Sequence, residues 1–208
     1  MRMPFATPRH SAHNKLRATL LMVAALLANA ALAEEAAPAC AYCLKPAEPF
    51  RIHGNTYYVG TRGLSSVLIT SGQGHILIDG GLPEMAPMIA DQLQVLGFSL
   101  RDVRLIVNSH AHAEHAGGLA DLARESGARL AMSPWNADAL RVGHPGPSDP
   151  QAGQLAGFPK FSLVRTVRDG EVLAVGPLRV QAHFTPGHTP GGTSWSWRSC
   201  EDNGRCVN

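Results

Sequence analysis

One stretch of ten residues, SHAHAEHAGG at positions 109–118, constrains this chain more than any other. It places three histidines and one glutamate within six consecutive positions, at the end of the run VRLIVNS, which is typical of a buried strand. His110 and His112 are two apart, so in extended backbone their imidazoles project to the same side and suit two ligands of one ion. Glu114 and His115 follow where the chain turns into a helix, and these adjacent side chains diverge. The pair can therefore face a second ion beside the first.

The ligand types in this motif indicate zinc, because imidazole nitrogen and carboxylate oxygen are common zinc ligands. The motif differs from the helical HExxH of metalloproteases, since no glutamate directly follows a histidine four residues before another. A second signal, TPGHTPGG, places His188 in a Gly/Pro loop after a strand, and we expect it to be the third ligand of the first ion. Gly117 and Gly118 would let the backbone pack closely under the site. This second signal disfavours a solvated loop that is merely rich in histidine.

The chain around the motif alternates between strand and helix patterns. Short β-type runs separated by a turn form a meander, and three segments have apolar residues at helical spacing next to glycine or proline signals. The expected strands are 50–60, 65–71, 75–81, 103–109 and 128–133, and the expected helices are 83–97, 119–127 and 134–141. This rhythm predicts an α/β fold in which helices cover the faces of a sheet.

The second half of the chain begins with a long Gly/Pro loop, residues 142–160. Loops of this length in a compact domain are usually functional or mobile. Strand patterns then return, and Asp169-Gly170 is the expected turn that joins the strand within residues 161–167 to the strand pattern of residues 171–184.

A final hairpin is expected at Asn203-Gly204, a strong tight-turn dipeptide. Cys200 and Cys206 flank this turn, so we expect a local disulfide at the tip of the hairpin. The return strand stops at Asn208, which reads as an unfinished hairpin in a domain that is incomplete at its C-terminus.

The N-terminus carries a targeting pattern. Four basic residues and no acid occupy the first seventeen positions, and the apolar run that follows ends in Ala31-Leu32-Ala33. This predicts a secretory signal peptide over residues 1–33, with cleavage before Glu34 and export to the periplasm. A membrane anchor and a buried core helix are the alternatives, but the run is short for a span and ends in a small-residue site.

Removal of the signal peptide changes the charge balance. The chain has 18 Lys and Arg against 16 Asp and Glu; without the four N-terminal bases, fourteen remain against sixteen, a net charge of −2. This argues against nucleic acid as a partner. Residues 34–49 follow as an irregular, Pro-rich arm. In an oxidising compartment Cys40 and Cys43 can pair with each other, stay free or seek another partner.

These motifs resemble those of the metallo-β-lactamase superfamily, whose pattern is HxHxDH followed by a distant histidine in a strand-to-loop turn. The resemblance is closest to the third subclass of secreted zinc β-lactamases, through the segments PFRIHGNTYYVG, GLSSVLI, HILIDGG, NSHAHAEHAGGL and HFTPGHTPGGTSWSW. It implies an αββα sandwich over residues 50–208, with its second half truncated and the metals at one edge between the two sheets.

The resemblance also implies roles for single residues. His110, His112 and His188 would bind the first zinc, and Glu114 with His115 would begin the second site of an enzyme that carries two zinc ions. Asp79 looks like the family's strand-end aspartate, which supports the metal loop from behind. A plain turn-capping role for Asp79 before two glycines is an equal alternative.

Two departures from the family pattern concern the second zinc. The family has aspartate where this chain has Glu114, and the extra methylene moves the carboxylate, whereas metal distances tolerate only about 0.2 Å. The family's last ligand is a histidine in a segment beyond residue 208. We therefore expect one well-supported zinc site and a weak second one. No spacing directs any further histidine at the site, so we expect surface or core roles for His53, His75, His144 and His183.

The expected activity is hydrolysis of the β-lactam amide bond of antibiotics by a zinc-bound hydroxide, with Glu114 in a catalytic role. The substitution at position 114 and the missing ligand would impair it. Two alternatives remain: another hydrolase of the superfamily, acting on a lactone or thioester, and a non-catalytic remnant that binds one zinc or does not fold stably. The expected partner is a small-molecule β-lactam, with no nucleic acid and no membrane after signal cleavage, and we expect a monomer.

Overall fold

The computed structural model describes Cys40 and residues 42–208 of the chain. The expected signal peptide, residues 1–33, and residues 34–39 and 41 of the arm lie outside the described residues, so the prediction of export stays a prediction. Within the described part we find no helix whose length and apolar content would let it cross a membrane.

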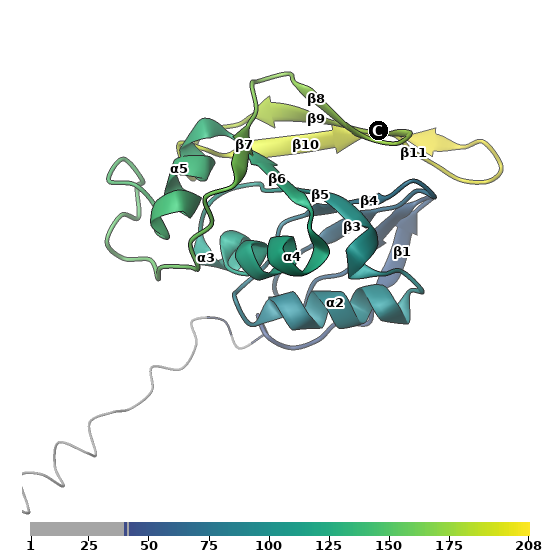
Figure 1. Ribbon diagram of the computed structural model, residues 1–208, viewed down its shortest axis with the longest axis horizontal. Coiled ribbons are helices and arrows are strands. Elements are labelled where there is room, and N and C mark those ends of the chain that lie inside the picture. Colours follow the sequence, from purple (N-terminus) through teal and green to yellow (C-terminus); the bar gives the residue numbers. More distant parts are fainter. Residues whose placement is uncertain (1–39, 41) are drawn as a thin grey trace, which may run out of the picture. The chain divides into compact units, whose positions relative to one another are not determined.

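A seven-stranded sheet forms the centre of the fold, and its spatial order follows the chain from β1 to β7 (Figure 1). The strands are β1 Phe50–His53, β2 Thr56–Tyr58, β3 Val67–Ile69, β4 His75–Ile78, β5 Val103–Val107, β6 Arg129–Met132 and β7 Val164–Thr166. Strands β1 to β4 pair antiparallel, which confirms the expected meander, whereas β4 to β7 pair in parallel. Parallel neighbours need crossover connections, and helices supply them here.

Helices α2 and α4 lie on one face of this sheet (Figure 1), and α5 packs into the same apolar cluster. The helices are α2 Met85–Val95, α3 Ala113–Ala116, α4 Leu119–Ser126 and α5 Pro134–Val142, with a 3-10 turn η1 at Leu100–Asp102. The three helices expected from the sequence are confirmed. Gly97 and Gly127 follow α2 and α4 with φ of 83° and 74°, a conformation that glycine adopts without strain. Ser133 caps α5 by accepting a hydrogen bond from the backbone N–H of Asn136.

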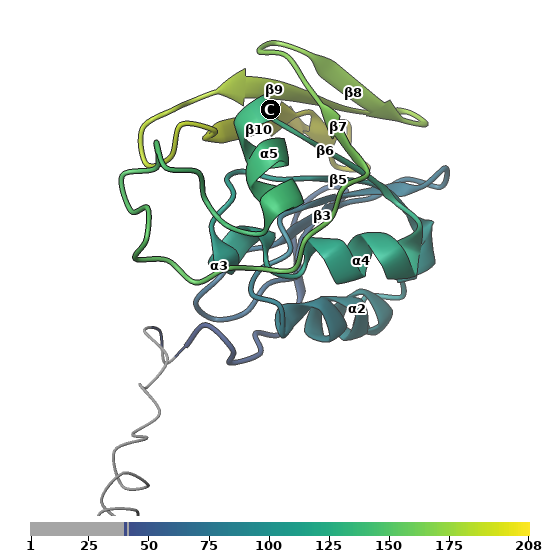
Figure 2. The ribbon, with the colours of Figure 1, turned by 60° about the vertical axis from the view of Figure 1, so that its left-hand side comes forward.

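A second sheet of three strands lies across the other face of the first (Figures 1 and 2). Its strands are β8 Val172–Val175, β9 Leu178–Phe184 and β10 Thr193–Trp197, in the antiparallel order β10-β9-β8. Helices, the seven-stranded sheet and the three-stranded sheet thus form successive α, β and β layers. The prediction of an α/β sandwich is confirmed.

Asp169-Gly170 forms a turn between β7 and β8, as the sequence predicts, but the two strands that it joins belong to different sheets. Strand β7 pairs in parallel with β6 in the first sheet, whereas β8 pairs with β9 in the second. The connecting residues 167–171 form a longer link than the two-residue turn of a tight hairpin, and they carry the chain from one sheet to the other.

Two apolar cores lie on opposite faces of the central sheet, because successive side chains of a strand point to opposite faces. In β4, Leu77 belongs to the core beneath the helices, together with Leu93 and Leu122. Its neighbour Ile76 belongs to the core between the two sheets, together with Val180. All five side chains are fully buried. One short strand therefore holds three layers together.

A short hairpin ends the chain, as expected from the sequence. Strands β11 Ser199–Cys200 and β12 Cys206–Val207 pair antiparallel, and a disulfide joins Cys200 to Cys206. Both predictions for this segment are confirmed. Cys40 and Cys43 are bonded to each other, the first of the three possibilities left open above.

Candidate metal centre

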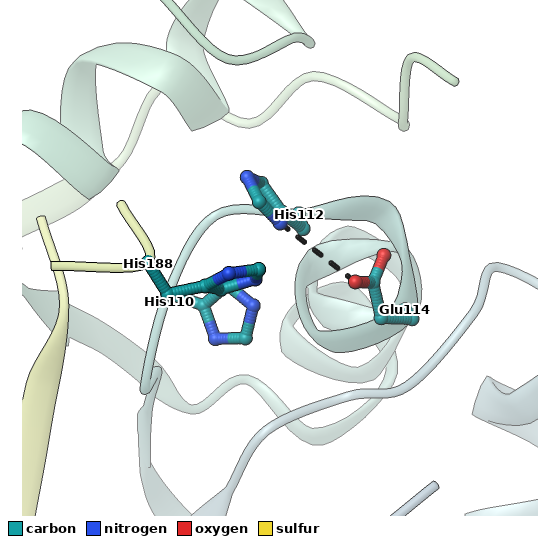
Figure 3. A group of neighbouring side chains, drawn as sticks. All are labelled: His110, His112, Glu114 and His188. Carbon is teal, nitrogen blue, oxygen red and sulfur yellow. Dashed lines mark ion pairs between the residues drawn. The ribbon is translucent and has the colours of Figure 1, made fainter. Parts of the chain in front are cut away.

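Four side chains from two distant parts of the chain come together beside the central sheet. His110 and His112 lie in the loop after β5, and Glu114 lies in the first turn of α3. His188 lies in the loop between β9 and β10 of the other sheet. One possible ligand atom from each residue lies within 4.8 Å of those of the other three (Figure 3).

The three imidazole rings of this group form a nearly regular triangle. Their centroids are 4.9 Å apart for His110 and His112, 5.0 Å for His110 and His188, and 4.8 Å for His112 and His188. The Oε1 atom of Glu114 lies 3.7 Å from Nδ1 of His112 (Figure 3). The third ring converges on the first two, as a cation shared by three histidines requires.

The protonation and the hydrogen bonding of these rings are those expected of ligands for a cation. Burial lowers the pKa of His110 to about 3, and the neighbouring His115 adds to this effect, so the ring is neutral and keeps a free lone pair. His110 Nε2 and His112 Nδ1 are buried and have no hydrogen-bond partner among the described residues. A buried nitrogen without a partner destabilises the fold, and a bound metal ion would satisfy both atoms. His188 is exposed, so the group is open to solvent on its side.

The loop that carries His188 is fastened to the first sheet by hydrogen bonds. The backbone N–H of Thr193 donates to the carbonyl oxygen of Ser109 at 2.8 Å. The hydroxyl of Ser133 donates to the carbonyl oxygen of Gly191, also at 2.8 Å. These bonds bring the two histidine loops together although they belong to different sheets.

Asp79, at the end of β4, supports the loop that carries the first two histidines. Its Oδ1 accepts hydrogen bonds from the backbone N–H of Ser109 at 2.7 Å and from Nδ2 of Asn108 at 2.9 Å. Its Oδ2 accepts from the Ser109 hydroxyl at 2.6 Å and contacts Nδ1 of His115 at 3.0 Å. All four contacts go to residues 108–115, called the metal loop here, rather than to the turn after Asp79. Of the two roles considered from the sequence, the structure favours support of the metal loop.

His115 stands apart from the four-residue group. Its ring lies 4.1 Å from that of His110, but its Nδ1 is engaged by Asp79, which leaves Nε2 for any other partner. Burial lowers the pKa of His115, but the hydrogen bond and the charge of Asp79 outweigh this effect and raise the pKa above its usual value. The structure places Glu114 with the three histidines, so the assignment of Glu114 and His115 to a second ion stays a prediction.

Glycines bring the backbone close together beneath the metal loop, as the sequence predicts. A Cβ atom on Gly118 would lie 2.3 Å from the carbonyl oxygen of Gly80, and one on Gly117 would lie 2.6 Å from the backbone nitrogen of Pro83. Both distances are far shorter than a normal contact. Only glycine therefore fits where α3 and α4 meet the turn after β4.

Asp149 also belongs to this region, and sequence analysis missed it. Its Oδ2 lies 3.1 Å from Nε2 of His112, and both side chains are fully buried. Asp149 lies in the long Gly/Pro loop, where no spacing rule relates it to the histidine motif. The unusual length of that loop is the one signal that marks the region as functional.

The remaining described histidines have other neighbours and lie outside the group, in agreement with the prediction. Their partners are Glu201 for His53, the backbone N–H of Ser71 for His75, the carbonyl oxygen of Pro145 for His144, and the hydroxyl of Ser196 for His183.

The fold is similar to those of solved metallo-β-lactamase structures. Rm3 metallo-β-lactamase is 55% identical, with a TM-score of 0.79 over 82% of this chain and 64% of that chain. MEM-A1, a subclass B3 metallo-β-lactamase from a soil metagenome library, is 54% identical, with a TM-score of 0.76 over 78% and 61%. The first B3 metallo-β-lactamase characterised with an active-site glutamic acid is 45% identical, with a TM-score of 0.77 over 79% and 62%. The chain spans less than two thirds of each of these structures.

Curated relatives are more distant and more varied. Lactamase-like protein AptB of Emericella nidulans is 31% identical over 68% of this chain and 36% of its own length. An atrochrysone carboxyl ACP thioesterase of Aspergillus fumigatus is 32% identical over 72% and 28%. A hydroxyacylglutathione hydrolase of Anaeromyxobacter dehalogenans is 30% identical over 62% and 40%. The chain thus spans about a third of the length of these relatives. Residues 59–201 match the family described as the metallo-beta-lactamase superfamily, and the chain belongs to that superfamily of hydrolases, with subclass B3 metallo-β-lactamases as its structural neighbours.

Proposed function

We propose that this chain is a zinc-dependent hydrolase that opens the β-lactam amide bond of antibiotics. The convergence of three imidazoles and one carboxylate carries the proposal. It is supported by sequence identities of 54–55% to the metallo-β-lactamases Rm3 and MEM-A1. The identities to the lactamase-like protein AptB, the thioesterase and the hydroxyacylglutathione hydrolase are lower, at 30–32%. The substrate is a small molecule that enters from the solvent side of His188.

The residues of the site have two roles, metal binding and proton transfer. His110, His112 and His188 would hold zinc through neutral nitrogens. When bound, zinc would supply Lewis acidity for the substrate carbonyl and for the attacking water. Glu114 is about one third exposed and close to the three rings, so its carboxylate can accept a proton from water or help to hold a cation. Asp79 and the glycines beneath the loop keep these groups in position.

A second zinc ion is part of the proposal, with Glu114 and His115 as its ligands and with weaker binding than the first. The B3 enzyme with an active-site glutamic acid supports the idea that a longer carboxylate is tolerated in such a site. We also propose export to the periplasm through residues 1–33, a location where disulfides such as Cys200–Cys206 persist.

A second candidate function is hydrolysis of a thioester or lactone. Of these two substrates, the thioester is favoured by the similarity to a carboxyl ACP thioesterase and to a hydroxyacylglutathione hydrolase. In both reactions water attacks a carbonyl carbon, so both can use the same group of metal ligands.

The two functions separate in one set of assays on the full chain. Zinc content would be measured, and hydrolysis of a chromogenic cephalosporin, a lactone and a thioester would be followed with and without a chelator. Chelator-sensitive turnover of the cephalosporin supports the first proposal, and turnover of the other substrates alone supports the second. His188→Ala is expected to abolish turnover, whereas His144→Ala, a change outside the group, is expected to keep it. Zinc binding without turnover of any of the three substrates would contradict both functions.

A further inference from the structure

The carboxylate of Asp149 occupies a place where a charged group is unexpected. It projects from the long loop between α5 and β7, yet its side chain is fully buried. Burial of a charge destabilises a protein unless the charge finds partners of its own. Its Oδ1 accepts a hydrogen bond from the backbone N–H of Gln151 at 2.9 Å, and its Oδ2 lies 3.1 Å from Nε2 of His112.

The turn at Asp149 explains only half of these contacts. Capping the N–H two residues ahead needs one acceptor oxygen, which serine or asparagine supplies without a buried charge. The negative charge and the second oxygen are directed at His112 instead. The loop therefore delivers Asp149 to the histidine for a reason beyond its own folding.

The contact determines which nitrogen of His112 carries the proton. A carboxylate accepts hydrogen bonds and cannot donate them, so Nε2 must hold the hydrogen of the neutral ring. The other nitrogen, Nδ1, then keeps its lone pair. This is the atom that is buried without a hydrogen-bond partner among the described residues and that faces Glu114 at 3.7 Å.

We infer that Asp149 is a positioning residue, which locks His112 in the tautomer and ring orientation that present Nδ1 to the metal. The inference rests on the metal site of the proposed function, but on none of its substrates. A carboxylate behind a metal-binding histidine also makes the ligand more basic, and such outer partners commonly change metal affinity about 10- to 100-fold. The contact between Asp149 and His112 therefore connects the long loop, residues 142–160, to the loop that carries His110 and His112.

The tautomer can be observed directly in the metal-free protein. Two-bond nitrogen–proton correlation spectra of the imidazoles, recorded at about pH 8, above the usual histidine pKa of about 6.5, would be assigned with a His112→Asn variant. We expect His112 to be protonated at Nε2 in the wild type and to become a mixture of tautomers in Asp149→Ser. Serine retains an acceptor for Gln151 but cannot reach His112. A wild-type His112 protonated at Nδ1 would overturn the inference.

Metal affinity supplies the second readout, with Co²⁺ and Zn²⁺ titrated in competition with a chromogenic chelator. Asp149→Ser is expected to weaken binding to the first site about 10- to 100-fold. Asp149→Asn keeps the shape of the side chain but offers one oxygen to two donors, so we expect an intermediate loss. The matched control is Ser148→Ala, which removes the hydrogen bond from Trp135 Nε1 to the same loop without touching His112, and its affinity should equal that of the wild type.

These measurements separate a failure of the proposed metal site from a failure of the role inferred for Asp149. A wild-type protein that binds no metal would remove both the metal site and the inference. If the Asp149→Ser variant bound metal as tightly as the wild type, the inference alone would be overturned, whatever substrate is hydrolysed. If Asp149→Ser weakened binding as much in a His112→Ala background as in the wild type, Asp149 would act through the loop rather than through His112.

Discussion

At the scale of single residues, Asp79 shows how the site is supported by a conformation that few residues adopt. It is the one described residue other than glycine with a positive φ, 63°. For a residue other than glycine, such a backbone costs about 1–3 kcal/mol, and aspartate and asparagine adopt it more readily than most. The contacts of both its oxygens with Asn108, Ser109 and His115 offset this cost.

Asp79→Asn tests this balance, because asparagine tolerates the backbone but replaces one acceptor oxygen with an NH₂ donor. That group would face donors of the metal loop, and a buried unsatisfied donor costs about 1–3 kcal/mol. We expect the free energy of unfolding, measured with urea, to fall by about this amount. Asp121→Asn, at a partly exposed acid of α4 whose ion pair with Arg124 lies at the surface, should change it by less than about 0.5 kcal/mol. Equal stability of the two variants would contradict the role given to Asp79.

His75 predicts a pH dependence that is separate from the metal site. Burial lowers its pKa and outweighs the opposing effects of a hydrogen bond to Gly74 and the charge of Asp102, while Arg104 adds to the lowering. The folded pKa lies below the unfolded value of about 6.5, so the unfolded chain takes up more protons as the pH falls. The stabilising contribution is therefore complete above about pH 6.5 and is lost below it.

The test compares urea unfolding of the metal-free wild type with His75→Asn between about pH 7 and 5. Asparagine retains an acceptor for the N–H of Ser71 but does not titrate. The wild type should lose stability more steeply, by at most about 1.4 kcal/mol per pH unit for one proton. His110 is common to both proteins and cancels in the comparison. His144→Asn, at an exposed histidine, should follow the wild type; parallel curves for all three proteins would disprove the assignment.

At the scale of elements, the sequence predicted the features that depend on residues close along the chain, such as helix ends. It did not predict strand pairing and loop packing, which depend on residues far apart along the chain. The ends of α2, α4 and α5 follow from glycine, serine and proline signals within a few residues. The partner of β7 does not, because a turn residue such as Gly170 reverses the chain without selecting which strand pairs next. The contact of Asp149 with His112 likewise depends on how a long loop packs. The ligand group itself was within reach, since two separate histidine motifs signal it.

Gly118 tests the close approach between the turn after β4 and the junction of α3 with α4. Its φ of −82° suits any residue, so an alanine there would act only through its Cβ, which would lie 2.3 Å from the carbonyl oxygen of Gly80. We expect Gly118→Ala to lower the free energy of unfolding by about 1–3 kcal/mol, the usual effect of overpacking. Gly72→Ala is the control, since nothing lies within 4 Å of its added Cβ. If both variants unfold alike, the glycines are not needed for packing.

At the scale of the whole molecule, the group of His110, His112, Glu114 and His188 combines residues that flank strands of both sheets. His110 and His112 follow a strand of the first sheet, and His188 precedes β10 of the second. A cation held by all three would link the layers, in addition to the apolar core between them and the hydrogen bonds from Ser133 and Thr193. Metal binding should therefore stabilise the fold as well as equip it for chemistry.

Thermal and urea unfolding with and without zinc measure this link. A ligand at 100 times its dissociation constant stabilises the folded state by about 2.7 kcal/mol, so zinc should raise the unfolding midpoint and a chelator should return it to the metal-free value. His188→Ala removes the ligand from the second sheet and should lose most of the zinc-dependent increase, while its metal-free stability stays near that of the wild type because this side chain is exposed. His144→Ala should keep the full increase. If His188→Ala retained it too, the cation would be held by the first sheet alone and would not join the layers.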